Sequence, residues 1–267
     1  TIDAGRQSCV FTVVASREET VELKGLTITG GWATRGGGIY STATLRVTNG
    51  VIAGNASYSG GGGIYNDGGT LTVANVAISG NVTTSILGRG GGIYNEGMLT
   101  VTNATIAGNA GNGESGGIFN DGTLALYNSI LWQNGDGELE PGRDSSIRSS
   151  LIGIDPRFIR NPSDGGDGWG DDSETPGVDE SANDDYGDLR LTSRSPAIGY
   201  GDNETAIDAD GNPIATDLDG NNRIYGESVD CGAFEFQDAA APGSEDASLT
   251  VNTSQDVFDP YDGRISL

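Results

Sequence analysis

The chain has 267 residues, a formal net charge of −24, one lysine and no histidine. This charge excludes the basic face that nucleic-acid binding needs, and an anionic membrane surface would repel it. The lack of histidine excludes Ser-His-Asp and Cys-His catalytic groups, and the sequence has no run of 18 apolar residues that would predict membrane insertion.

Four copies of an imperfect repeat occupy residues 36–134. Each copy starts with a glycine run followed by Ile-Tyr or Ile-Phe, so that one aromatic residue marks each copy: Tyr40, Tyr65, Tyr94 and Phe119. These positions advance by 25, 29 and 25 residues, and a fixed period of this size is typical of a solenoid. Residues 10–31 form an earlier, degenerate copy.

Alternating apolar and polar residues within each copy, as in Leu99-Thr100-Val101-Thr102, are typical of a β-strand. Three short strands and three turns fill about 25 residues, which is one coil of a parallel β-helix with coils about 4.8 Å apart. The sequence therefore predicts an all-β protein, a parallel β-helix (β-solenoid). Ile39, Ile64, Ile93 and Ile118 are expected to form one inward column of its core.

Asparagines recur at two places in the repeat and predict two structural ladders along the axis. Stacked asparagine side chains can join their amides from coil to coil and can satisfy backbone groups at turns. The first ladder is expected at Asn49, Asn75, Asn103 and Asn128, and the second at Asn55, Asn81, Asn109 and Asn134. Asn55, Asn81, Asn103, Asn203 and Asn252 also begin N-x-S/T glycosylation sequons, but three of these are ladder positions, and we favour the structural role.

The aromatic column of Tyr40, Tyr65, Tyr94 and Phe119 has two interpretations. If its rings face solvent, they could stack on sugar rings, and if they face inward, they belong to the core, which we favour. Asp67, Glu96 and Asp121 form a neighbouring acidic column that binds a cation or nothing. The repeats hold few other carboxylates, so the paired acids of an inverting glycosidase are not evident.

The second half differs in composition, because residues 135–267 hold 30 of the 38 acidic residues. We expect regular coils over 1–150, an acidic C-terminal and capping region of irregular coils and loops over 151–236, and a linker over 237–248. Two Asp-x-Asp-Gly-Asn strings place Asp208, Asp210, Asp217 and Asp219 on tight turns. These four carboxylates are candidate ligands for Ca²⁺, the one cofactor considered; no organic cofactor is expected. As plain Asx-turns they need no metal.

Cys9 and Cys231 are the only cysteines. Joining them would require Cα atoms within about 7 Å, whereas a straight solenoid of six or more coils keeps its ends apart. Two free or separately buried thiols are therefore expected.

The repeats resemble those of bacterial polymorphic outer-membrane-type adhesins, on the Gly-Gly-Ile-Tyr-Asn copies at 62–66 and 91–95. Residues 155–235 resemble the choice-of-anchor Q domain of secreted surface proteins, on Asp217-Leu218-Asp219-Gly220-Asn221 and Val229-Asp230-Cys231-Gly232-Ala233-Phe234-Glu235. Residues 249–267 resemble the opening of a CSLREA-type unit. These resemblances imply a right-handed β-helix at the cell surface, with a following unit that begins in the tail.

Three functions remain open at this point. The first is an extracellular structural or adhesive module of a larger tandem surface protein or filament, whose partners are neighbouring copies or units stacked head to tail. The second is a carbohydrate-binding module, for which polysaccharide is the partner, and the third is a polysaccharide lyase or hydrolase. We favour the first and expect no catalytic residues.

Overall fold

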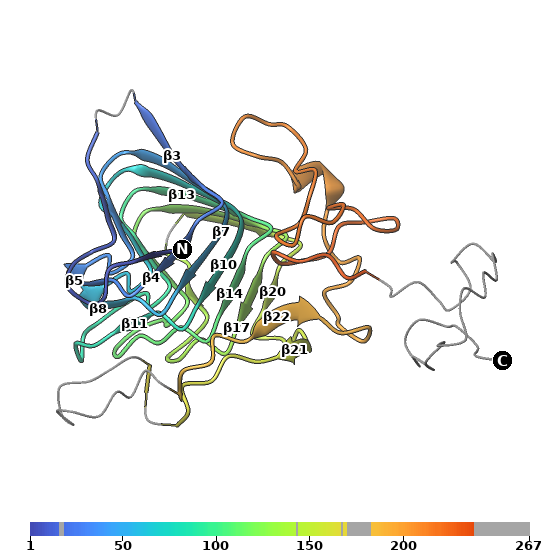
Figure 1. Cartoon of the computed structure of the whole chain (residues 1–267). Helices are drawn as coiled ribbons and strands as arrows, with labels where there is room; N and C mark the ends of the chain where they lie inside the picture. Colours follow the sequence, from blue (N-terminus) through green and yellow to red (C-terminus); the bar gives the residue numbers. More distant parts are fainter. Residues whose placement is uncertain (16–18, 143, 167, 170–182, 238–267) are drawn as a thin grey trace, which may run out of the picture.

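The computed structural model describes residues 1–15, 19–142, 144–166, 168–169 and 183–237. Its first 152 residues form a parallel β-helix of about six coils, as the repeats predict (Figure 1). Most of the expected linker and the whole of the tail at 249–267 lie outside the described residues. Within the described part, no helix is long and apolar enough to cross a membrane.

Each coil contributes short strands to three main faces of the solenoid. The first face consists of β2 (Phe11–Val13), β6 (Ile39–Ser41), β9 (Ile64–Asn66), β12 (Ile93–Asn95), β15 (Ile118–Asn120) and β18 (Leu139–Glu140). The second consists of β3 (Thr20–Lys24), β7 (Thr44–Ala53), β10 (Thr70–Ser79), β13 (Met98–Thr102), β16 (Thr123–Tyr127) and β19 (Asp144–Arg148). The third consists of β1 (Ile2–Asp3), β4 (Thr27–Thr29), β14 (Thr105–Ala107), β17 (Ile130–Trp132) and β20 (Leu151–Ile152), together with the C-terminal halves of β7 and β10.

Three smaller groups complete the secondary structure of the described residues. A short sheet holds β5 (Trp32–Arg35), β8 (Ala56–Gly60) and β11 (Val82–Thr83). β21 (Phe158–Arg160) and β22 (Asp188–Leu191) form an antiparallel pair, and a 3₁₀ turn spans Asn203–Thr205.

Equivalent residues of successive coils stack in register, so inward apolar positions form continuous columns. Ile39 pairs with Ile64, which pairs with Ile93, and all three side chains are fully buried. Burial of such a side chain contributes roughly 1.5–3 kcal/mol. The predicted inward column is confirmed.

The corners of each coil are made by residues with left-handed backbone conformations. Three such positions recur along the axis: Gly25, Asn49, Asn75, Asn103, Asn128 and Ser149; Gly30, Gly54, Gly80, Gly108 and Gln133; and Gly36, Gly61, Gly90, Ser115 and Asp136, all with φ between 44° and 67°. Glycine and asparagine adopt this conformation at the lowest cost. Their recurrence explains why the repeat is so rich in both.

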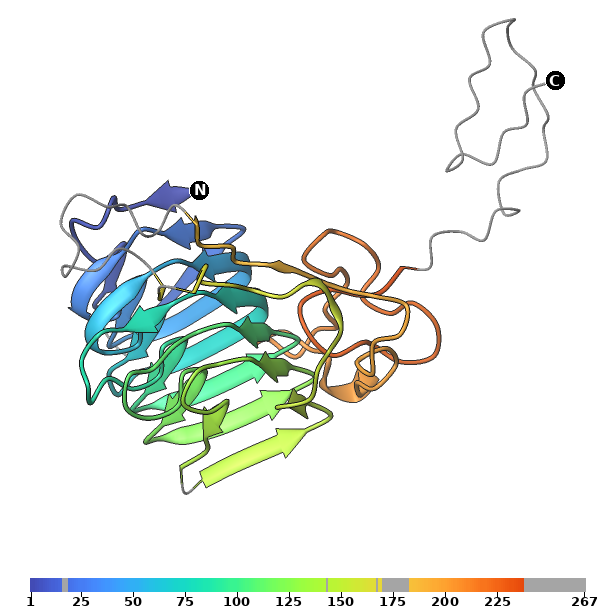
Figure 2. The same ribbon diagram turned by 90° about the horizontal axis from the view of Figure 1, so that it is seen from below.

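The region after Ile152 differs from the expectation of further terminal coils. The described residues of 155–237, here called the flanking arm, run along the side of the solenoid rather than onto its end (Figure 2). The arm contacts successive coils at Asn128, Asn103 and Asn75 through Asp202, Asp230 and Thr216. The short apolar strings of the arm therefore cover the side of the third face, where Leu189 and Leu191 pack with Ile130 and Leu151.

The glycines of the second left-handed column, such as Gly80 and Gly108, have no side chains, so the arm packs directly on their backbone. A Cβ at Gly80 would lie 2.5 Å from the ring of Tyr186 and 2.8 Å from that of Trp169, and a Cβ at Gly108 would lie 2.5 Å from Pro162. Trp169 and Tyr186 stack on each other with ring centroids 5.9 Å apart. Glycine is therefore required here both for the turn and for close approach of the arm.

We expect Gly80→Ala to destabilise the chain more than Gly25→Ala. Both glycines have positive φ, which costs alanine about 1–2 kcal/mol, but only at Gly80 does the added Cβ collide with aromatic rings, since nothing lies within 4 Å at Gly25. Chemical denaturation of the two variants measures the difference. Equal losses would contradict the packing of Tyr186 and Trp169 on this corner.

Candidate functional site

The second predicted ladder is a continuous chain of buried side-chain amides. Asn55 donates from Nδ2 to Oδ1 of Asn81, Asn81 to Asn109, and Asn109 to Asn134, each at 2.9 Å. Asn134 in turn donates to the Glu138 carboxylate at 2.6 Å, which ends the ladder. Burial raises the pKa of Glu138 above its usual value.

A further ladder lies on the first face, at asparagines outside the two predicted ladders. Asn66 donates to Asn95 and Asn95 to Asn120, both at 2.6 Å, and Asn120 donates to the Pro141 carbonyl. The signal was present in the sequence, because an asparagine follows Ile-Tyr or Ile-Phe in three of the four copies.

The ladder predicted at Asn49, Asn75, Asn103 and Asn128 has a different arrangement. Only Asn75 bonds to its neighbour in the row, donating to Asn49 at 2.8 Å. Asn128 donates to the Asp202 carbonyl at 2.9 Å and accepts from the Asp202 N–H at 2.8 Å. This row lies at a left-handed corner beside the arm, and the amides of Asn75, Asn103 and Asn128 donate to carbonyl groups of the arm backbone.

Burial also bears on the sequons. The side chains of Asn55, Asn81 and Asn103 are fully buried, which agrees with structural roles for these three. Asn203 is exposed, but its amide donates to the Glu227 carbonyl and accepts from the Val229 N–H. Asn252 lies outside the described residues.

The aromatic column lies on the outer side of the first face and not inward, as we had favoured, with its rings stacked on one another. Ring centroids are 5.9, 4.7 and 5.0 Å apart along Tyr40, Tyr65, Tyr94 and Phe119. Guanidinium groups cover part of the column, with Arg35 5.1 Å from the Tyr65 ring and Arg89 4.8 Å from the Phe119 ring. Tyr65 and Phe119 are buried and the other two rings are half-buried, so within the column each ring face is turned to another ring.

Two carboxylates of the acidic column beside these rings form hydrogen bonds with tyrosine hydroxyl groups. The Tyr40 hydroxyl donates to the Asp67 carboxylate. Burial, aided by a hydrogen bond to Glu96, raises the pKa of Tyr65. Asp67 and Glu96 therefore have protein partners at this surface.

The two Asp-x-Asp-Gly-Asn strings form tight turns held by their own carboxylates. Asp208 Oδ1 accepts from the N–H groups of Asp210 and Asn212, each at 2.9 Å. Asp217 likewise accepts from the Asn221 N–H at 2.8 Å.

The remaining carboxylates of these strings have different surroundings. Asp210 forms a 2.8 Å ion pair with Arg46, and burial raises the pKa of Asp219. Within the described residues, no three His, Cys, Asp or Glu side chains converge on a position that could hold a metal ion.

A buried charged cluster joins the arm to the solenoid, and the sequence did not single out its arginine. Arg223, 1% exposed, donates from Nη2 to Glu235 at 2.9 Å and from Nη1 to Asn75 at 3.4 Å. Asp217 accepts from the Glu235 N–H at 2.9 Å, and Asp230 accepts from the Phe236 N–H at 2.7 Å. The residues that carried the domain resemblance therefore fold the arm and fix it to several coils of the solenoid.

Glu235 couples the stability of this cluster to pH. Burial raises its pKa to about 7, because the loss of hydration and the nearby Asp230 together outweigh the attraction of Arg223. Burial raises the pKa of Asp230 as well. The folded chain therefore holds protons here that the unfolded chain releases.

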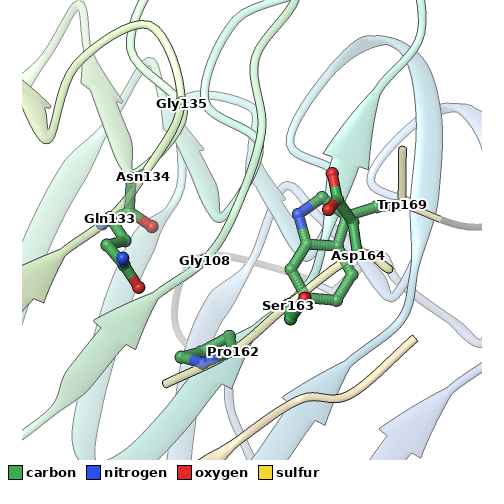
Figure 3. A pocket seen from close by; sticks show the side chains of 8 residues that line it. All are labelled: Gly108, Gln133, Asn134, Gly135, Pro162, Ser163, Asp164 and Trp169. Atoms are coloured by element: carbon green, nitrogen blue, oxygen red, sulfur yellow. The ribbon is translucent and has the colours of Figure 1, made fainter. Parts of the chain in front are cut away.

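An open pocket of about 460 Å³ lies between a corner of the solenoid and the start of the arm (Figure 3). Gln133 and Asn134 lie on one side of it, and Ser163, Asp164 and Trp169 lie on the other. Gln133 occupies the left-handed column that glycine fills in the four preceding coils. This pocket could not be predicted from the sequence, because Trp169 lies in a stretch whose composition is that of a loop.

Cys9 and Cys231 are both free, as predicted. Cys231 is buried and its thiol donates to the Ser149 carbonyl, whereas Cys9 is half-buried beside Phe11 and Gly38 in the first coil. Burial raises the pKa of both thiols, for Cys231 to about 12. Neither thiol is therefore an activated nucleophile.

Comparison with known proteins gives no family: no protein-family model, no curated protein and no solved structure matches the chain. The fold defines the class of the protein as a parallel β-helix with a flanking arm.

We expect Asn81→Ala to lower the free energy of unfolding by about 3 kcal/mol or more. The change leaves the Asn55 N–H and the Ile52 carbonyl without their buried partner, and each unsatisfied group costs about 1–3 kcal/mol. The exposed Asn112, whose amide makes one 3.4 Å bond, supplies the control Asn112→Ala. Equal denaturation midpoints for the two variants would argue against the ladder.

Stability is expected to fall as the pH rises from about 4.5 to about 7. Over this window the unfolded Glu235, with its ordinary pKa of 4.5, loses its proton before the folded one does. Glu235→Gln should flatten the fall, whereas Glu227→Gln, at an exposed position of the same arm, should not. Melting temperatures across the window test this, and identical slopes in wild type and Glu235→Gln would refute it.

Proposed function

We propose that the chain is an extracellular structural or adhesive β-helix module of a larger tandem surface protein or filament, whose units stack head to tail. The observation that carries this proposal is that the asparagine and aromatic side chains of the repeats contact their counterparts in neighbouring coils. Two asparagine ladders and the aromatic column all bond or pack from coil to coil. A stack built in this way is a rigid spacer and leaves few groups for chemistry.

Further support comes from composition and from the resemblances. A charge of −24 keeps neighbouring modules soluble, and the resemblance to adhesin repeats, a choice-of-anchor Q domain and a CSLREA-type opening favours a surface protein with a following unit. The described part of the chain has no catalytic arrangement among its buried carboxylates, since each one is bonded to backbone or to Arg223. A polysaccharide lyase or hydrolase is therefore the third choice.

Labelling of cells tests this proposal directly. An antibody against the folded module is applied to intact and to permeabilised cells of the source organism. We expect equal labelling of both, because the module is exposed outside the cell. Labelling that appears only after permeabilisation would contradict the proposal.

Carbohydrate binding is the second candidate, and the pocket favours it over the aromatic column. Rings stacked on one another have no free inner faces for a sugar, whereas Trp169 borders an open pocket beside the carboxylate of Asp164 and the hydroxyl of Ser163. An aromatic ring flanked by polar groups is the usual composition of a small-molecule site.

Binding to a panel of polysaccharides distinguishes the two candidates. A sugar-binding pocket predicts retention in affinity electrophoresis that Trp169→Ala abolishes and that Tyr58→Ala, at an exposed tyrosine elsewhere, preserves. A purely structural module predicts no retention on any polysaccharide of the panel.

A further inference from the structure

The last coil of the solenoid has an open edge. β19 pairs with β16 on one side and, within the described residues, has no strand on the other. All five of its residues are exposed, and Figure 2 shows this yellow-green strand at the end of the stack. The arm lies along the side of the coils and leaves this edge free.

The inward apolar columns of the solenoid end at this last coil, where their final side chains are no longer covered by a further coil. Ile147 is 41% exposed, although Leu126, its neighbour in the same column, is fully buried. Leu139 and Ile152 end the columns of the other two faces and are only partly buried. A row of unpaired backbone groups beside such apolar side chains favours addition of another strand.

The tail contains a segment that matches this edge. Residues 249–251 read Leu-Thr-Val, identical to residues 71–73 of β10 and 99–101 of β13. In those strands the leucine and the valine point inward and are buried, and the threonine points outward. Continuing the register of the column places Leu249 over Ser145 and Val251 over Ile147.

The chain is long enough to bring this segment to β19. The Cys231 thiol donates to the Ser149 carbonyl at 2.9 Å, so the arm passes the C-terminal end of β19. The arm then returns to the coil of Asn75, where Arg223 bonds to Glu235, and this coil lies three coils or about 14 Å from Ser149. From the last described residue, the eleven residues 238–248 reach roughly 36 Å when extended. The five residues of β19 span about 17 Å.

We propose that residues 249–251 of the same chain pair in parallel with β19 and begin a further coil. This inference rests on the proposed head-to-tail stacking and names its junction: Val251 covers Ile147, and the inward columns continue into the next unit. The match ends at Val251, because Asn252 follows it directly, whereas the corner asparagine of β10 lies two residues after Val73.

Hydrogen exchange of the full chain tests the junction. We expect the β19 amides that face away from β16 to exchange roughly 100-fold more slowly than open-chain amides. Val251→Asp should remove this protection, because it places a carboxylate against Ile147, and the matched Thr250→Asp should keep it, because that side chain points to solvent.

Three results would overturn the proposal. The first is fast exchange of the β19 amides in the unaltered chain, a measurement that depends on no variant. The second is protection that survives Val251→Asp. The third is protection that disappears on dilution, which would assign the strand to a neighbouring copy. In each case surface labelling of intact cells still reports on the proposed function, so the two failures are distinguishable.

Discussion

The whole architecture depends on the left-handed corner residues. A coil pairs in register with the next only if the chain turns by the same amount at the same three places, and side chains other than glycine and asparagine resist the positive φ that these turns need. Gly54, Gly80 and Gly108 supply it in one column, and Asn49, Asn75 and Asn103 supply it in another. The in-register pairing then places equivalent side chains next to each other, so the same corner conformation recurs in successive coils.

Polar side chains that stack in this way can satisfy one another's hydrogen-bonding groups. The row from Asn55 to Asn134 is fully internal, with each amide donating to the next. The row from Asn49 to Asn128 differs because its side chains lie at a corner on the side of the solenoid, where the arm backbone takes their hydrogen bonds. The same residue type therefore stabilises the stack in one place and fixes the arm in the other.

Much of this could be predicted from the repeats. Period, alternation and glycine runs define the coil, the inward columns and the ladder at Asn81 and Asn109. The position of the arm could not be predicted, because it depends on contacts between residues far apart in sequence, such as Arg223 with Asn75. The composition of the acidic half indicated turns, and the turns at Asp208 and Asp217 are present, but the burial of Asp217 and Asp230 around an arginine leaves no local pattern in the sequence. The tyrosine column was expected to face inward, but Tyr40 alternates with the inward Ile39 and lies on the outer side of its strand, where the neighbouring ring of Tyr65 stacks on it.

The buried cluster around Arg223 couples the stability of the arm to that of the coils. Arg223 bonds to Glu235 within the arm and to Asn75 of the solenoid, so detachment of the arm breaks the bond to Asn75 and exposes the apolar residues packed between arm and coils. This coupling limits local opening of the arm, and local opening is what exposes a folded chain to proteolysis.

Native-state hydrogen exchange measured as a function of denaturant tests this coupling most directly. We predict that amides of β9 and β12 and those of residues 229–235 exchange through one common opening, with equal free energies and equal dependence on denaturant. A separate opening of residues 229–235, at a lower free energy than that of the coils, would contradict the account.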